Sequence, residues 1–191
     1  MASKLLDIKL QHEGKFLKFY NFVLDDGRNY EVISRRELNL ENVNNFAADA
    51  VDILAFSRDF QKILIIKEWR VPVNDYIYAL PAGLRESDET ILSAAQRELF
   101  EETGQYISGV YKILPPAYQS AGMSNEAVAT VVCAVSSEIL SSEHSTKDED
   151  ITPMWITKKD AEELLKSNKM SGRCQMVLYW WLVNDIQING I

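Results

Sequence analysis

The sequence predicts an α/β protein in which helices cover both faces of a mixed sheet, with an antiparallel β-hairpin in front of it. Short apolar runs rich in β-branched residues recur along the chain, and turn residues separate them, as is typical of strands. Helical periodicity or helix-capping residues occur in three stretches, at about residues 90–104, 158–167 and 173–184. The 191 residues, 47% of them apolar, suffice for one domain with a small appended piece.

The first predicted element is the hairpin. Residues 15–23 are rich in Phe, Leu and Tyr, an Asp-Asp-Gly turn follows, and residues 29–35 form the return strand. The polar residues 36–47 are expected to be a connector. We therefore expect residues 1–45 to be an N-terminal extension and residues 46–191 to be the main domain.

The main domain contains the remaining predicted strands. They are residues 49–56, 63–67, 76–80, 107–114, 127–135 and 151–156. Pro115 and Pro116 are expected to end the strand 107–114, because proline has no N–H to donate to a sheet. Residues 136–149 are polar and are expected to form a loop.

The helix at 90–104 has clear end signals. Thr90 is a suitable N-cap, and Gly104 can adopt the left-handed conformation that ends a helix. Between these ends, one side of the helix is apolar at 100° per residue, through Ile91, Leu92, Ala95 and Leu99.

The two C-terminal helices are expected to pack on the sheet. Thr157 and Asp160 have the spacing of a capping box at the start of the first of them. In the second, four large side chains should pack against the core: Met176, Leu178, Trp180 and Trp181. We expect core packing of the tryptophans rather than stacking on a nucleobase, because apolar periodicity is mainly a burial signal.

Composition excludes several classes of function. The net charge of −8 argues against a nucleic-acid or anionic-membrane surface. No stretch approaches the ~20 apolar residues of a membrane span, and the N-terminus lacks the apolar core of a signal peptide. Cys133 and Cys174 lack metal-ligand spacing and are expected to be reduced thiols in a cytoplasmic protein. His12 and His144 are the only histidines, which argues against a histidine-based zinc site or a catalytic triad.

Three glutamates crowd one arc of the helix at 90–104. Glu98, Glu101 and Glu102 are neighbours at helical spacing, so their charges repel one another. A bound divalent cation would remove this repulsion, and Mg²⁺ prefers carboxylate oxygens. The alternative is an ordinary solvated face, with Arg97 and Glu101 as an i,i+4 ion pair.

The register of the whole stretch is more specific than its charge. It resembles the Nudix box, G-x5-E-x7-R-E-U-x-E-E-x-G-U with U a bulky apolar residue, at Gly83, Glu89, Arg97, Glu98, Leu99, Glu101, Glu102 and Gly104. Gln105 departs from the pattern at a position that packs rather than reacts. The resemblance to the Nudix hydrolases implies an α/β/α sandwich. It also implies that Arg97 orients Glu89 or Glu101 and does not contact substrate.

The resemblance implies a metal site on this helix. Glu98 and Glu102 would be direct ligands of Mg²⁺, with Mn²⁺ as an alternative ion, Glu101 would assist, and the Ala82 carbonyl would complete the site. Metal ions can neutralise a diphosphate and lower the pKa of a bound water. Phosphoryl transfer needs little beyond such positioning and charge stabilisation.

A general base is implied outside the box, on a loop. Glu149, just before the last strand, matches that place best, and Asp148 and Glu143 are alternatives. The other interpretation of these residues is an acidic solvent-exposed loop.

Four further segments resemble the ADP-ribose pyrophosphatases of this family. They are the hairpin around Tyr30, then Glu68–Pro72, Leu80–Gly83, and Ser120–Glu126. In that group the hairpin pairs with a second subunit and its aromatic residues sandwich adenine. The resemblance therefore implies a homodimer.

The same resemblance assigns substrate contacts to several residues. Phe16 and Tyr30 stand at the stacking positions, although Phe16 could equally belong to a core. Glu31 would accept hydrogen bonds from the base edge. Arg35 and Arg70 would bind the diphosphate or the adjoining ribose. Glu126, at the end of its segment, is counted with the substrate-binding residues.

The sequence thus predicts a homodimeric, Mg²⁺-dependent hydrolase that splits ADP-ribose into AMP and ribose 5-phosphate. Ala121 stands where many such enzymes have a proline, so another nucleoside diphosphate sugar, such as GDP-mannose or UDP-glucose, is an alternative substrate. A non-catalytic nucleotide sensor is a second alternative, although such modules usually lose box glutamates that this chain keeps. A nucleoside triphosphatase is disfavoured by the hairpin.

Overall fold

The computed structural model describes residues 3–137, 139–141 and 150–184. Contacts divide the chain into two compact units. The N-terminal unit comprises Met1–Asp49 and Pro115–Val128, and the box unit comprises Ala50–Leu114 and Ala129–Ile191. The N-terminal unit therefore contains residues 115–128, which the expected extension over residues 1–45 did not include.

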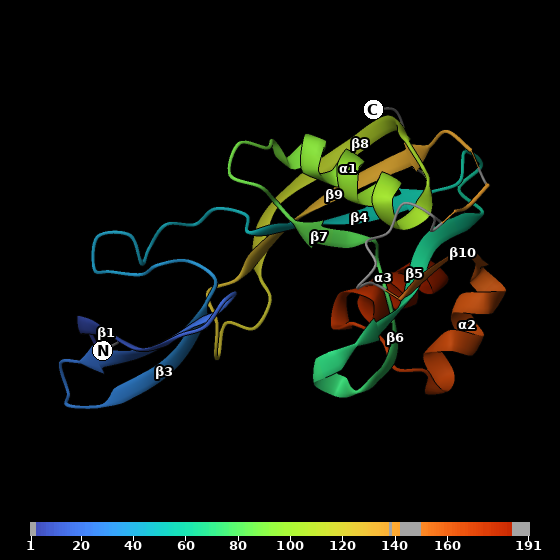
Figure 1. The fold of residues 1–191 in the computed structure, drawn as a ribbon. Coiled ribbons are helices and arrows are strands. Elements are labelled where there is room, and N and C mark those ends of the chain that lie inside the picture. The colour runs from blue at the N-terminus through green and yellow to red at the C-terminus, as the bar shows by residue number, and fades with distance from the viewer. Residues whose placement is uncertain (1–2, 138, 142–149, 185–191) are drawn as a thin grey trace. The chain divides into compact units, whose positions relative to one another are not determined.

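The N-terminal unit contains a three-stranded antiparallel sheet within the described residues (Figure 1). Strands β2 (Lys18–Leu24) and β3 (Asn29–Ser34) form the predicted hairpin. Strand β1 (Leu5–Glu13) pairs with β2 and was not predicted, because most of its side chains are exposed and its apolar alternation is weak. A small core of Tyr20, Val32 and Leu38 lies on one face of this sheet.

The box unit is an α/β/α sandwich built on a mixed sheet. Its described strands have the order β10-β5-β4-β9-β8, with β6 beside β5 and β7 beside β4. The strands are β4 (Ala50–Phe56), β5 (Lys62–Arg70), β6 (Asp75–Ala79), β7 (Ala82–Leu84), β8 (Ile107–Tyr118), β9 (Ala127–Val135) and β10 (Ile151–Thr157). Residues 115–118 of β8 and 127–128 of β9 belong to the N-terminal unit. The helices are α1 (Ile91–Thr103), α2 (Lys158–Ser167) and α3 (Gly172–Val183), and a 3-10 turn, Val71–Val73, joins β5 to β6.

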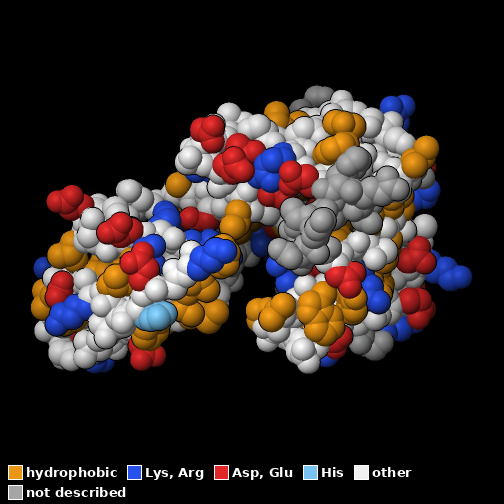
Figure 2. Space-filling model, in the orientation of Figure 1, with side chains coloured by type: hydrophobic (Ala, Val, Ile, Leu, Met, Phe, Trp, Pro, Cys, Tyr) orange, Lys and Arg blue, Asp and Glu red, His pale blue; other side chains and the backbone are white. Residues whose placement is uncertain are grey.

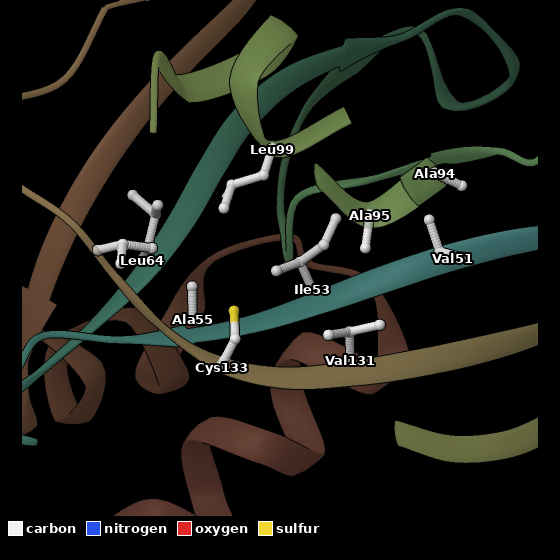
Figure 3. Packing of buried hydrophobic residues seen from close by; sticks show 10 residues of the cluster. Val51, Ile53, Ala55, Leu64, Ala94, Ala95, Leu99, Val131 and Cys133 are labelled. Carbon is white, nitrogen blue, oxygen red and sulfur yellow. The ribbon is translucent and has the colours of Figure 1, made fainter. Parts of the chain in front are cut away.

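Helix α1 covers one face of this sheet, and α2 and α3 cover the other (Figure 1). Figure 3 shows the first core, in which side chains of β4 such as Ile53 point toward Ala95 and Leu99 of α1. Strand β4 is buried along its whole length, because alternate residues face the two cores. The predicted fold class is confirmed.

Strand β7 was not predicted as a strand. It pairs antiparallel with β4, with Ala82 opposite Asp52 and Gly83 opposite Val51. The Pro81 carbonyl accepts a hydrogen bond from the Ile53 N–H at 2.8 Å. The first residues of the box are thereby fixed to the sheet and are not part of a free loop.

The expectation that Pro115 and Pro116 end a strand is wrong, since β8 runs to Tyr118. In the described part of the chain β8 is the last strand on its side of the sheet order. A strand at an edge needs hydrogen-bond donors on one side only, so proline is tolerated there.

Three side chains on the helices differ from expectation. Met176 and Trp180 are 63% and 49% exposed, whereas Leu178 and Trp181 are buried as predicted. Leu92 of α1 is 40% exposed, and Ala94 lies in the core where Leu92 was expected. The core-facing stripe of a helix is narrower than its apolar stretch, so residues beside the stripe stay at the surface.

Gln105, the departure from the box pattern, is buried, and its Nε2 donates to the Ile139 carbonyl. The amide thus fills an apolar position with one of its polar groups paired. Within the residues that the structure describes, no helix is long and apolar enough to cross a membrane.

Candidate active site

The box occupies β7, the loop after it and helix α1. Both predicted helix ends are confirmed: Thr90 Oγ1 accepts from the Ser93 N–H at 3.1 Å, and Gly104 has a φ of 69°. The Gly104 N–H donates to the Phe100 carbonyl at 2.8 Å. These ends set which side chains of the helix face the loop.

Arg97 connects the loop to the helix. Its Nε and Nη2 donate to the two carboxylate oxygens of Glu89 at 2.8 and 2.9 Å, and Nη2 also donates to the Leu84 carbonyl at 2.9 Å. Its Nη1 donates to Glu98 at 2.7 Å and to Glu101 at 3.1 Å. Figure 2 shows acidic side chains on both sides of basic ones over the surface that α1 and the preceding loop occupy in Figure 1.

Glu89 is held as a charged acceptor. The Arg97 guanidinium, followed by the Glu86 N–H at 2.9 Å, lowers the pKa of Glu89 to about 2. Glu89 in turn raises the pKa of Arg97 above its ordinary value. The pair stays ionised across the neutral range, so its geometry does not depend on pH there.

Two carboxylates reach the backbone of β7. Glu102, only 3% exposed, accepts from the Ala82 N–H at 3.0 Å. A Cβ at Gly83 would fall on the Glu98 carboxylate, so that carboxylate lies directly against the glycine. Glu98 and Glu102 therefore meet at the same dipeptide of β7.

The residues fit a hard divalent cation. The carboxylates of Glu98 and Glu102 are mostly buried, and the repulsion between two such charges favours a cation between them. Glu98 and Glu101 both also accept a hydrogen bond from Arg97 Nη1. Among the residues that the structure describes, no group of three or more His, Cys, Asp and Glu is arranged to hold a metal. A cation here would be held by a few carboxylates, which leaves positions for water and phosphate oxygens.

Arg70 ends β5 in the same unit. Its Nη2 lies 3.0 Å from Glu68 Oε2, and the Glu68 side chain is only 7% exposed, whereas that of Arg70 is 52% exposed. The role of Glu68 in anchoring Arg70 was not predicted. An acidic residue two positions before an arginine, at the end of a strand with an apolar centre, was the available signal.

The other predicted substrate residues belong to the N-terminal unit. Tyr30 is 48% exposed, and its hydroxyl donates to the Gly122 carbonyl at 2.6 Å. Arg35 Nε donates to Glu126 Oε1 at 2.7 Å. Phe16 is 69% exposed, with the Lys15 ammonium 4.9 Å from its ring centroid, so it is not part of a core.

Glu31 lines a surface hollow of about 490 Å³ with Tyr30, Asn21 and three other residues of the N-terminal unit. The predicted base Glu149, and its alternatives Asp148 and Glu143, lie outside the described residues.

The comparison with protein families decides what this arrangement belongs to. The model of the NUDIX domain matches residues 47–175, which is more than half of the chain. The chain belongs to the Nudix family. The resemblance stated from the spacing of the box is confirmed, and the network around Arg97 is this chain's form of the Nudix box.

Two relatives are similar over part of their length. The chain is 33% identical to the ADP-ribose pyrophosphatase of Bacillus subtilis over 121 residues, which cover 63% of this chain and 64% of the relative. It is 31% identical to the mouse ADP-sugar pyrophosphatase over 124 residues, covering 61% and 54%. The chain thus matches less than two thirds of the length of either relative.

A solved structure shares the fold of the whole chain. A crystal structure of an ADP compounds hydrolase superposes with a TM-score of 0.69 and covers 96% of this chain and 95% of that one. The sequence identity is 16%, so this likeness concerns the fold.

Proposed function

We propose that this Nudix protein is a Mg²⁺-dependent hydrolase that splits the diphosphate of ADP-ribose into AMP and ribose 5-phosphate, with Mn²⁺ as an alternative ion. One observation carries the proposal: Glu98 and Glu102 meet at the Ala82–Gly83 backbone and are backed by the Arg97–Glu89 pair. The names of the two relatives support the choice of substrate.

In this proposal Glu98, Glu102 and the Ala82 carbonyl hold the ion, and Glu101 assists them. The bound ion would offset the charge of the diphosphate and lower the pKa of a bound water. Arg97 acts as a positioning residue, because its donors are used on Glu89, Glu98, Glu101 and a backbone carbonyl. It keeps the carboxylates in place before the substrate arrives.

The base remains a prediction from the sequence, with Glu149 preferred. We expect Glu149→Gln to lower kcat by about 10²- to 10⁴-fold, the usual contribution of a positioned general base. Glu143→Gln should retain most of the activity. If Glu143→Gln alone abolishes turnover, the assignment to Glu149 is wrong.

The substrate contacts in this proposal are those that the resemblance assigns. Phe16 and Tyr30 stack on the base, Glu31 accepts from its edge, and Arg35 and Arg70 bind the diphosphate or ribose. A second subunit completes the substrate site, so the protein works as a homodimer. Its proposed location is the cytoplasm. Light scattering at micromolar concentration should give twice the mass of one chain, and a monomer would contradict the shared site.

A specific observation favours a second substrate class. Ala121 lines a hollow of about 280 Å³ together with Tyr30, on the wall where many ADP-ribose enzymes have proline. Another nucleoside diphosphate sugar, such as GDP-mannose or UDP-glucose, is therefore the alternative substrate. Ala121→Pro should shift the ratio of kcat/KM values toward ADP-ribose if this position selects the substrate. An unchanged ratio would remove Ala121 as a reason for the second class.

A panel of nucleoside diphosphate sugars with Mg²⁺, followed by phosphate release with a coupled phosphatase, tests the activity. We expect ADP-ribose to be the best substrate, and Glu102→Gln to lower turnover at least 100-fold with an unchanged circular dichroism spectrum. Glu162→Gln, on the exposed surface of α2, is the control and should behave as the wild type. Failure to hydrolyse any member, together with tight binding of one, would instead favour the nucleotide sensor.

A further inference from the structure

Arg35 and Glu126 form an ion pair that joins two distant parts of the N-terminal unit. Arg35 follows β3, Glu126 precedes β9, and 91 positions separate them in sequence. The Nε–Oε1 distance is 2.7 Å, and the side chains are 37% and 29% exposed. Within the described residues, the Arg35 guanidinium has no other hydrogen bond. Its terminal nitrogens, Nη1 and Nη2, thus remain available to a ligand.

The loop that carries Glu126 is fixed to β3. The Ile33 N–H donates to the Met123 carbonyl at 2.9 Å, and Ile33 forms a parallel bridge with Ser124. The Tyr30 hydroxyl holds the Gly122 carbonyl. The two sides of the ion pair are therefore parts of one hydrogen-bonded assembly and are not two independent loops.

Arg36, the neighbour of Arg35, also holds this junction. Its Nε lies 3.0 Å from Asp49, and its Nη2 donates to the Asn125 carbonyl at 3.1 Å. Asn125 directly precedes Glu126. The backbones that carry Arg35 and Glu126 are thus tied together next to the ion pair itself.

We infer that Glu126 is a positioning residue: by accepting from Nε it orients the Arg35 guanidinium so that Nη1 and Nη2 bind diphosphate oxygens. This inference rests on the proposed function for the nature of the ligand. A guanidinium binds phosphate best through two parallel N–H groups, and a side chain ordered in advance loses less entropy on binding. The resemblance predicts that Glu126 contacts substrate, whereas this inference gives it an indirect role.

The competing interpretation is a latch, in which diphosphate must displace Glu126 from Arg35. The two interpretations predict opposite changes in the affinity for diphosphate. Removing a positioning carboxylate weakens the binding of diphosphate, whereas removing a latch tightens it. The variant Glu126→Gln also separates the two interpretations. Glutamine keeps an acceptor oxygen for Nε and loses the charge.

Binding of ADP, measured by calorimetry, and KM for ADP-ribose test the inference. We expect Glu126→Ala to raise both the Kd of ADP and KM about tenfold, the effect of one charge-assisted hydrogen bond, with kcat within a factor of two. Glu126→Gln should stay within about threefold of the wild type. In an Arg35→Ala background, Glu126→Ala should add nothing, because Glu126 acts through Arg35.

Two controls separate positioning from structure. Asp26→Ala breaks another ion pair of the same unit, with Arg28 at 2.7 Å, and should leave ADP binding unchanged. Adenosine, which lacks phosphates, should bind Glu126→Ala and wild type equally. Weaker binding of adenosine to Glu126→Ala would show a structural effect and overturn the inference, as would tighter ADP binding or an additive double variant.

The outcomes also separate this inference from the proposed activity. ADP binding that depends on Arg35 and Glu126, without turnover of any member of the panel, would uphold the inference and defeat the hydrolase. Turnover of ADP-ribose that is indifferent to both residues would do the reverse. A wild-type protein that does not bind ADP would overturn the inference.

Discussion

At the scale of the residue, position 83 requires glycine because a side chain of α1 lies very close to its backbone. Its φ is not in the left-handed region, so the backbone there does not require glycine. The requirement comes from the Glu98 carboxylate, which occupies the place of a Cβ. The small size of Gly83 is therefore what lets a glutamate of α1 reach the backbone of β7.

Gly83→Ala should consequently impair the site more than the fold. The added methyl group displaces the far end of a flexible side chain, so the melting temperature should change little. Turnover of ADP-ribose should fall about 10- to 100-fold, as is usual when a support of a metal ligand is disturbed. Gly109→Ala is the matched control, because nothing lies within 4 Å of its added Cβ. Equal losses in both variants would contradict the proposed contact.

At the scale of the element, the start of helix α2 is fixed by hydrogen bonds in its first turn. Thr157 Oγ1 accepts from the Asp160 N–H at 3.3 Å, and Asp160 accepts from the Thr157 N–H at 2.9 Å, so the predicted capping box is present in full. The Thr157 N–H, followed by the Thr157 hydroxyl at 2.7 Å, donates to the Asp160 carboxylate and lowers its pKa. The carboxylate therefore stabilises the helix above the ordinary aspartate pKa, and its contribution is lost as pH falls below that value.

Thr157→Ala should lower the free energy of unfolding by about 1 kcal/mol, the typical cost of losing an N-cap. Urea unfolding at pH 7 measures this change. Lys159→Ala, in the same turn but outside the cap, should change it by less than about 0.5 kcal/mol. The cost of Asp160→Asn should shrink as the pH approaches 3, and a cost that grows at low pH would refute the sign of the pKa shift.

At the scale of the whole molecule, the two cysteines report on the box unit from opposite sides of its sheet. Cys133 of β9 lies in the core under α1, and Cys174 of α3 lies in the core on the other face of the sheet. Both are free and buried. Burial raises the pKa of each thiol to about 12, so both stay protonated and unreactive in the folded protein.

We expect neither thiol to react with a disulfide reagent at pH 8 until the box unit opens, and both to react in urea. The burial of neutral thiols stabilises the fold below the ordinary cysteine pKa, and this contribution is lost as pH rises toward 12. Rates of labelling at increasing urea concentration measure the opening. A thiol that reacts in the native protein at the rate of a free cysteine would contradict its burial.

The sequence by itself determined the features that depend on neighbours in the chain. The ends of α1 at Thr90 and Gly104, the capping box of α2 and the β2–β3 hairpin follow from short-range spacing. The register of the Nudix box follows in the same way, because Glu98, Glu101 and Glu102 share one helix. Such features need only local backbone geometry, which a few adjacent residues fix.

Tertiary structure alone decided the contacts between distant segments. The pairing of β7 with β4, the approach of Glu98 to Gly83 and the Arg35–Glu126 ion pair join residues that sequence spacing does not relate. The exposure of Trp180 and the continuation of β8 through its prolines depend on which face and which edge the sheet leaves uncovered. Sheet register and helix packing set these relations, and both arise from the burial of the whole core rather than from any one stretch.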